Sequence, residues 1–256
     1  MDEPRFLAVG DGALCVEFGD KIDPRINAEV GALFRALCGK PIRGVRECVP
    51  TFRSLTVLFD PAVLTARRLE QKIQKRLATA QNTRDAAKRV FVIPVCYAPV
   101  FGEDMPQVSA HTGLAPDEII KRHCGTDYLI YMLGFLPGFA YLGGLDPALH
   151  TPRLQNPRTK IPAGAVGIGG EQTGIYPIAS PGGWQLIGRT PVRPYDPARI
   201  PPILFAAGDY IRFRAIDEAE YTRLELLQSQ GETIWEVRNG FLHDFAIGRL
   251  AQHGAG

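Results

Sequence analysis

The sequence predicts two domains: a small α+β domain over residues 1–85, followed by a mainly-β barrel domain over residues 86–256. Three observations support this division. Up to residue 77, segments with strand periodicity alternate with apolar residues at helical spacing. Residues 79–88 (TAQNTRDAAK) are polar and lack apolar periodicity, so we interpret them as a linker with a boundary near residue 86. Beyond the linker, many short strands with turn signals are typical of a small closed barrel.

The first domain is expected to place helices on one face of an antiparallel sheet. Two strands are predicted over residues 5–18, around the turn Gly10-Asp11-Gly12, and further strands over residues 45–49 and 53–60. Asp23-Pro24 predicts a helix start, with Asp as N-cap and Pro in the first turn. A second helical region is predicted from Asp60-Pro61 onward, because Leu69, Ile73 and Leu77 recur at a spacing of four.

The second domain is predicted to begin with a strand over residues 90–97. Two short helices should follow, the second starting at Pro116. Later elements are predicted at three places: strands over 127–133 and 210–213, and a helix over 217–228. Asn239-Gly240 predicts a hairpin turn between residues 233–237 and a strand beginning at Phe241.

Composition excludes several classes of protein. A hydrophobic content of 45% and a charged content of 22% are those of a globular protein, and a net charge of +2 gives no reason to expect nucleic acid binding. No apolar run approaches the length that spans a bilayer, and the acidic start of the chain is unlike a signal peptide. We therefore expect a cytoplasmic protein. The five scattered cysteines never form CxxC, which predicts free, mostly buried thiols rather than disulfides or a metal site.

The stretch Leu133–Pro191 is dense in glycine and proline without being of low complexity. Glycine allows positive φ and close backbone approach, and proline fixes φ, so the stretch should form shaped turns and short strands. Polar and aromatic side chains on such turns are well placed to line a pocket. The alternative is a glycine-rich barrel corner without a ligand.

Several residues of this stretch are candidates for binding a substrate. Arg158, Lys160 and Arg189 could hold an anion, arginine through its bidentate fork, although surface ion pairing is the alternative for each. Gln172 and Tyr176 could orient an amide or a carboxyl group, or could be satisfied structurally.

Backbone amides and aromatic rings complete the candidate set. The turn from Ser180 to Trp184 offers the N–H groups of Gly182 and Gly183 to an oxyanion, unless it is only a tight turn. Trp184 and Tyr141 could form an apolar wall or fill the core. Outside the stretch, His123 shares a helical face with Ile119. It is a candidate general base, with a hydrogen-bonded, half-buried histidine as the alternative.

Common catalytic motifs are missing from the sequence. No GxxxxGK[ST] phosphate loop and no HExxH zinc motif occur, and Ser180 is not in a GxSxG elbow. The residues therefore predict no metal site and no nucleotide site of these kinds.

Four ordered motifs carry a resemblance to a known family: GF-x-PGF-x-YL (134–142), Pro157-Arg158, IPAGAVGIGG-x-QTGIYP (161–177) and SPGGW-x-x-IGRTP (180–191). They closely resemble the family of the B subunit of the ATP-dependent bacterial 5-oxoprolinase. The same family covers allophanate hydrolase subunit 1 and the inhibitor of a sporulation histidine kinase. The resemblance continues through the N-terminal segment, at residues 12–19, 44–45 and 49–60.

The resemblance implies a ferredoxin-like N-terminal domain and a cyclophilin-like barrel. It also implies partners, namely an A subunit together with a homologous C subunit, which with this chain open 5-oxo-L-proline to L-glutamate using ATP. The ATP site is then expected to be shared or to lie on a partner. Arg158 would bind the carboxylate, and Gln172 with Gly182-Gly183 would stabilise developing charge. Two alternatives are a regulatory protein that docks on a histidine kinase and a subunit of allophanate hydrolase or urea carboxylase type. One departure is Asn156-Pro157-Arg158, where the family commonly carries Thr-Pro-Arg.

Overall fold

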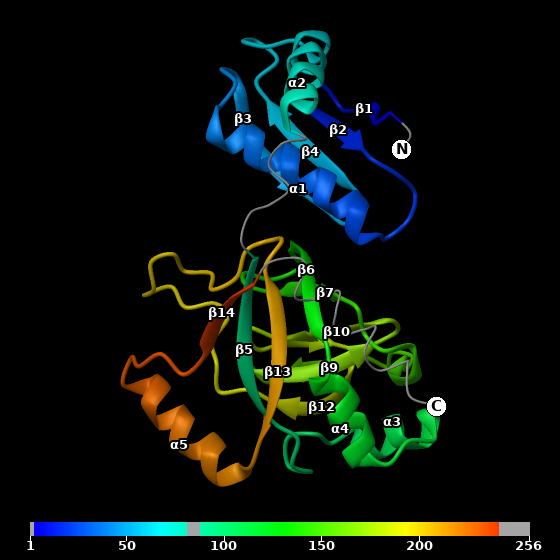
Figure 1. Cartoon of the computed structure of the whole chain (residues 1–256), viewed down its shortest axis with the longest axis vertical. Helices are drawn as coiled ribbons and strands as arrows, with labels where there is room; N and C mark the ends of the chain where they lie inside the picture. Colours follow the sequence, from blue (N-terminus) through cyan, green and yellow to red (C-terminus); the bar gives the residue numbers. More distant parts are fainter. Residues whose placement is uncertain (1–2, 81–87, 241–256) are drawn as a thin grey trace. The chain divides into compact units, whose positions relative to one another are not determined.

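The computed structural model describes residues 3–80 and 88–240 (Figure 1). Contacts between residues divide the chain into two units, with the change between Ala87 and Lys88. Each unit has a hydrophobic core built from its own residues. Residues 241–256, which are predicted to belong to the barrel, lie outside the described residues.

The first unit is a four-stranded antiparallel sheet with two helices on one face. The sheet order is β1-β2-β4-β3. Side chains alternate along the central strands, so Leu14, Val16, Leu55, Val57 and Phe59 are buried against the helices. The elements are β1 (Arg5–Val9), β2 (Ala13–Glu17), α1 (Pro24–Gly39), β3 (Val45–Pro50), β4 (Ser54–Phe59) and α2 (Ala66–Ala80).

The predicted start of α1 is confirmed, and that of α2 is wrong. The Asp23 side chain accepts the Arg25 backbone N–H at 2.6 Å, which satisfies an amide that would otherwise lack a partner at the helix start. Asp60 does not start a helix. Its carboxylate accepts the Ala62 N–H in a separate turn, and α2 begins at Ala66. Local side-chain bonding at Asp60 therefore competes with helix formation.

The order of elements in this unit differs from a strict ferredoxin-like fold. That fold runs β-α-β-β-α-β, whereas the first unit runs β-β-α-β-β-α. Moving β1 from the start of the chain to its end would produce the ferredoxin-like order. The α+β class with an antiparallel sheet is as the sequence predicts.

The second unit is a mixed sheet of eight strands that is nearly closed into a barrel. Its order is β10-β9-β12-β5-β13-β6-β7, with β14 also paired to β5. The long strands β5 and β13 run parallel side by side, and the other pairings are antiparallel (Figure 1). The two end strands, β7 and β10, contact each other without a hydrogen-bonded ladder. The mainly-β barrel class is therefore confirmed in its coarse form.

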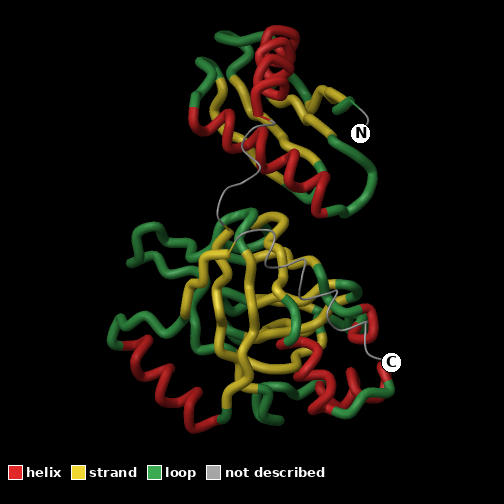
Figure 2. The backbone as a smooth tube through the Cα atoms, in the orientation of Figure 1, coloured by secondary structure: helices red, strands yellow, loops and turns green. Residues whose placement is uncertain are grey.

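Helices lie outside this barrel (Figure 2). The helices are α3 (Met105–Thr112), α4 (Pro116–Cys124), the 3-10 turn η2 (Pro147–Leu149) and α5 (Glu218–Ser229). The main-sheet strands are β5 (Lys88–Cys96), β6 (Asp127–Leu133), β7 (Ala140–Gly143), β9 (Ala165–Gly169), β10 (Gln172–Ile175), β12 (Gln185–Arg189), β13 (Tyr210–Ile216) and β14 (Glu236–Gly240). A separate antiparallel pair joins β8 (Arg158–Ile161) to β11 (Ser180–Gly182).

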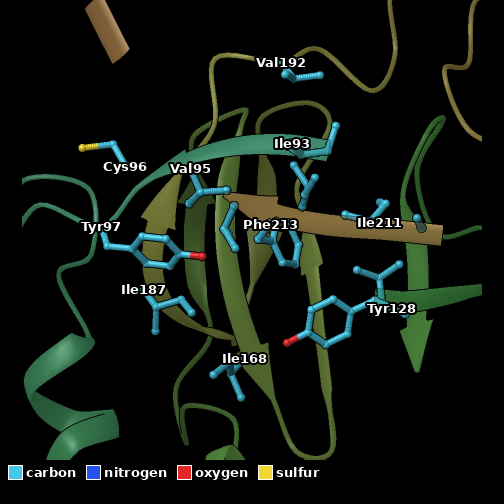
Figure 3. Close-up of a cluster of buried hydrophobic side chains, with 14 of the residues drawn as sticks. Ile93, Val95, Cys96, Tyr97, Tyr128, Ile168, Ile187, Val192, Ile211 and Phe213 are labelled. Carbon is cyan, nitrogen blue, oxygen red and sulfur yellow. The ribbon is translucent and has the colours of Figure 1, made fainter. Parts of the chain in front are cut away.

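Aliphatic and aromatic side chains fill the barrel (Figure 3). Tyr97 and Tyr128 enter the cluster from two sides, with their hydroxyl groups turned inward. The thiols are less buried than the sequence suggests, because Cys96 is the one fully buried cysteine and Cys38 is exposed. No described helix is long and apolar enough to cross a bilayer.

The predicted hairpin at Asn239-Gly240 is wrong in its described half. Both residues continue β14 and pair with Arg89 and Lys88 of β5, so they do not form a turn. The edge of β5 offers an unpaired row of backbone groups, and pairing along it satisfies these residues better than a two-residue turn would. The second predicted strand of that hairpin lies outside the described residues.

Candidate functional site

One open pocket of about 420 Å³ lies on the second unit, and the glycine-rich stretch builds it. Its walls come from the loop between β6 and β7, the segment before β8, and the turn around β11. Its volume falls in the range of about 300–1,000 Å³ that is usual for small-molecule sites. The lining residues are Phe135, Phe139, Tyr141, Arg153, Leu154, Pro157, Tyr176, Pro181, Gly182, Gly183 and Trp184.

The aromatic walls are organised around Phe139, which is buried. Its ring makes edge-to-face contacts with four other aromatic rings. Aromatic pairs prefer this geometry to direct face-to-face stacking. The centroid distances are 5.6 Å to Phe135, 5.2 Å to Tyr141, 5.7 Å to Tyr176 and 5.6 Å to Trp184. Such interlocked rings hold the pocket wall in one arrangement.

Phe135 stands at this wall in a strained conformation. Its φ is +64°, and it is the one non-glycine residue with positive φ among those described. The Leu136 N–H donates to the Gly134 carbonyl at 2.7 Å, so Phe135 is the centre of a three-residue γ-turn. The ring is nevertheless 64% exposed. A strained backbone that presents an exposed aromatic ring is typical of functional sites.

Glycine at position 182 allows the pocket floor to form. A Cβ atom there would lie 2.5 Å from the Tyr176 hydroxyl oxygen and 2.8 Å from Ile161 Cδ1. Burial raises the pKa of the Tyr176 phenol, although the Trp184 amide and Arg153 and Arg158 act in the opposite direction. The phenol is therefore protonated at neutral pH, and its O–H remains a donor.

Arg153 is the one charged residue among those that line the pocket. It is exposed, and its guanidinium lies 5.9 Å from the centroid of the Trp184 ring. That distance is within the range of a cation–π interaction. Across the described parts of the chain, no ion pair or hydrogen bond of its guanidinium is found.

Arg158, predicted to bind a carboxylate, is instead paired within the protein. Its Nη2 donates to Asp104 Oδ1 at 2.7 Å, and its Nε lies 3.2 Å from Glu103 Oε1. The Asp104 hydrogen bond, followed by the charges of Asp104 and Glu103, raises the pKa of Arg158 despite partial burial. Arg158 does not line the pocket, although Pro157 beside it does. Its position indicates that it supports the pocket wall.

His123 is placed in the barrel core rather than in the pocket, so its predicted role as general base is not supported. It is 0% exposed and stacks on Phe213 with a centroid distance of 4.5 Å. The Thr173 hydroxyl donates to the Gly167 carbonyl and so accepts the His123 Nε2–H at 2.7 Å. His123 Nδ1 therefore accepts the Tyr97 O–H, also at 2.7 Å. Burial lowers the pKa of His123 to about 3, which keeps the ring neutral.

The other predicted residues divide into two groups. Tyr141, Tyr176, Gly182, Gly183 and Trp184 line the pocket, as the prediction of a ligand-binding stretch requires. Four more predicted residues do not line the pocket. Lys160 is exposed on β8, and Gln172 is the first residue of β10. Ser180 is 7% exposed, and Arg189 donates to the Ala163 carbonyl at 3.0 Å. The Ser180 hydroxyl has no hydrogen-bond partner in the described chain.

Six residues that line the pocket were not predicted as site residues: Phe135, Phe139, Arg153, Leu154, Pro157 and Pro181. Of these, Arg153 is the charged one and Phe135 presents an exposed aromatic ring. Phe135 lies within the motif GF-x-PGF, but an exposed aromatic side chain carries no signal of its own in a sequence. For Arg153 a signal existed, because Thr151-Pro152-Arg153 is itself a Thr-Pro-Arg triplet. That triplet is the motif that residues 156–158 lack.

Comparisons with known proteins identify the same family as the glycine-rich motifs of the sequence. Residues 4–205 match the family model "Carboxyltransferase domain, subdomain C and D". The chain belongs to this family. Within the carboxyltransferase-domain family, a Bacillus subtilis protein named as the B subunit of 5-oxoprolinase is 40% identical over 83% of this chain and 93% of its own length. Its Escherichia coli O157:H7 namesake is 38% identical over 83% of this chain and 96% of its own length.

Solved structures of the carboxyltransferase-domain family share the fold. The structure of TTHA0988 is 37% identical, with a TM-score of 0.72 over 80% of this chain, and this chain spans 40% of its length. The Kluyveromyces lactis urea amidolyase covers 97% of this chain and 17% of its own, with a TM-score of 0.78. At 19% identity, that likeness shows the fold alone. The family expected from the glycine-rich motifs is confirmed by the family model and by the sequence relatives.

Proposed function

We propose that this chain is the B subunit of an ATP-dependent 5-oxoprolinase, which opens the lactam of 5-oxo-L-proline to give L-glutamate. The observation that carries the proposal is the identity of 38–46% to three proteins that are named as this subunit. Two of these are covered over more than nine-tenths of their length. The pocket supports the proposal, because the motifs that resemble this family supply most of its walls.

The proposed enzyme needs other subunits. We assign the remaining parts of the reaction to an A subunit together with a homologous C subunit, and we expect this chain to be inactive alone. The sequence lacks a phosphate-binding loop of the Walker type, so we place the ATP site on a partner or between subunits. We also propose that the second unit is cyclophilin-like and that the first is a permuted ferredoxin-like unit that serves assembly of the complex. The complex is proposed to be cytoplasmic.

In this reaction ATP activates the lactam carbonyl, because resonance makes an unactivated lactam a poor electrophile for water. The lactam oxygen attacks the γ-phosphorus and ADP leaves. Water adds to the activated carbon, the C–N bond breaks, and the ring nitrogen takes a proton to become the amine. A second water releases phosphate from the acyl phosphate, which leaves glutamate. Donors such as the Tyr176 hydroxyl and the Gly182-Gly183 backbone are suited to the charge that develops on oxygen.

Reconstitution tests this function. The full chain is mixed with the A and C subunits, 5-oxo-L-proline and ATP, and glutamate, ADP and phosphate are measured. We expect glutamate to require this chain and ADP to form in equal amounts. Glutamate formation no greater than in the same mixture without this chain would overturn the proposal.

A second substrate class belongs in the same experiment. A putative urea carboxylase of Emericella nidulans is 30% identical over 62% of this chain, although the match covers 14% of that protein. Urea and allophanate should therefore be offered to the reconstituted complex in place of 5-oxoproline. Turnover of urea or allophanate, without turnover of 5-oxoproline, would show that the chain is a subunit of the allophanate hydrolase or urea carboxylase type.

A further inference from the structure

We infer that the pocket of this chain, without any partner, binds the substrate as a small ring bearing a carboxylate, and that Arg153 pairs with that carboxylate. The inference rests on the proposed function for the identity of the ring, 5-oxo-L-proline. It adds the location of the substrate and the residue that recognises its charge.

The electrostatics of the lining select an anion. Arg153 contributes a full positive charge, and no acidic side chain is among the lining residues. The guanidinium is held near the Trp184 ring, and in the described chain it makes no ion pair of its own. By contrast, Arg158 is paired with Asp104 and Glu103 through its Nη2 and Nε, and its buried Nη1 has no partner among the described residues. A carboxylate fits the planar fork of an unoccupied guanidinium better than it fits an ammonium group.

The walls select a compact apolar body next to that charge. The rings of Phe135, Phe139 and Tyr141 stand around the pocket, and Leu154 with Pro157 closes one side. A five-membered ring can pack against these surfaces through its methylene groups.

A second polar group completes the recognition. Tyr176 lines the pocket and its phenol stays protonated, so its O–H proton can be donated to a ligand acceptor. A lactam carries such an acceptor in its carbonyl oxygen. Arg153 and Tyr176 thus complement the two oxygen-bearing groups of 5-oxoproline, a carboxylate and a carbonyl.

Direct binding to the full chain tests the inference. We would titrate 5-oxo-L-proline, its neutral carboxamide and 2-pyrrolidinone, and follow binding by saturation-transfer NMR and tryptophan fluorescence. The wild-type chain should bind the acid roughly 10- to 100-fold more tightly than the carboxamide. Arg153→Gln should bind acid and carboxamide alike, and Arg153→Lys should retain part of the preference. Arg193→Gln, which removes an exposed arginine outside the pocket, is the matched control and should behave as wild type.

Each failure has its own meaning. Absence of acid binding by the chain alone, equal binding of acid and carboxamide, or unchanged acid preference in Arg153→Gln would overturn the inference. None of these results would affect the proposed function if the reconstituted complex still released glutamate. Conversely, selective binding by the chain together with an inactive complex would leave the site in place and overturn the function.

Discussion

Arg158 and Asp104 form an ion pair that ties the pocket wall to the barrel. Arg158 Nη2 donates to Asp104 Oδ1 at 2.7 Å, and Asp104 Oδ2 accepts the Leu186 backbone N–H at 2.6 Å. The carboxylate is almost completely buried, at 2% residue exposure. The pair thus connects three parts of the unit: the start of α3, strand β12, which follows Trp184 in the sequence, and the segment that carries Arg153 and Pro157.

Removing Arg158 should destabilise the fold as well as the site. Arg158→Ala leaves the Asp104 carboxylate buried without its cation, which costs about 3–5 kcal/mol in a fully buried pair. Because a quarter of the Arg158 side chain reaches solvent, we expect a loss of about 2–3 kcal/mol in the free energy of unfolding, measured by urea denaturation. Lys160→Ala, on the same strand and exposed, is the control and should change it little. Wild-type stability with abolished turnover would instead restore Arg158 as a substrate-binding residue.

The same pair shows what the sequence could and could not predict. Local signals succeeded: the Asp23 N-cap, the buried stripe of Leu69 and Ile73, and the strand alternation of β4 each depend on neighbours within a few residues. The choice between Arg153 and Arg158 depends on Asp104, which lies about fifty residues away from both. The same holds for His123, whose partners Tyr97 and Thr173 lie 26 and 50 residues away along the chain. Motif composition located the pocket, but long-range side-chain pairing decided which arginine faces it.

Gly182 and Gly183 offer a matched pair of substitutions. Gly182→Ala puts a Cβ 2.5 Å from the Tyr176 hydroxyl, so the phenol must move from its place in the pocket lining. At Gly183 the nearest atom to a new Cβ is 3.5 Å away, which is ordinary contact. We expect Gly182→Ala to weaken 5-oxoproline binding at least about tenfold and Gly183→Ala to have little effect. Equal effects of the two substitutions would show that Tyr176 is not held against Gly182.

Phe135 should strengthen substrate binding at a cost in the stability of the fold. Asn adopts positive φ more readily than Phe, and the Phe135 ring is largely exposed, so Phe135→Asn loses little burial while relieving strain of about 1–3 kcal/mol. We expect a melting temperature equal to or above that of the wild type, together with weaker binding of 5-oxoproline. Phe135→Ala is the control that removes the ring without relieving the backbone. A lower melting temperature for the Asn variant than for the Ala variant would contradict the strained turn.

His123 should make stability depend on pH. Its pKa is about 3 when folded and about 6.5 when unfolded, so between these values the unfolded chain binds the extra proton. This contribution to stability is complete above pH 6.5 and is lost as the pH falls toward 3, by about 1.4 kcal/mol per unit. His123→Gln should therefore reduce the slope of unfolding free energy between pH 5 and 6.5, whereas exposed His111→Gln should not. Equal slopes for both variants would mean that His123 is not held neutral.

The barrel should fold without the first unit. Its core runs from Phe91 to Trp235, and the core of the first unit lies between Phe6 and Leu77, so the two share no residue. A chain that begins near residue 86 and keeps the C-terminus retains β5, which pairs with β12, β13 and β14. We expect cooperative urea unfolding of this fragment and 5-oxoproline binding within about twofold of the full chain, since every pocket residue belongs to it. An unfolded fragment would refute the boundary. A folded fragment without binding would show that the first unit shapes the pocket, and the proposal that this unit serves only assembly would then be wrong.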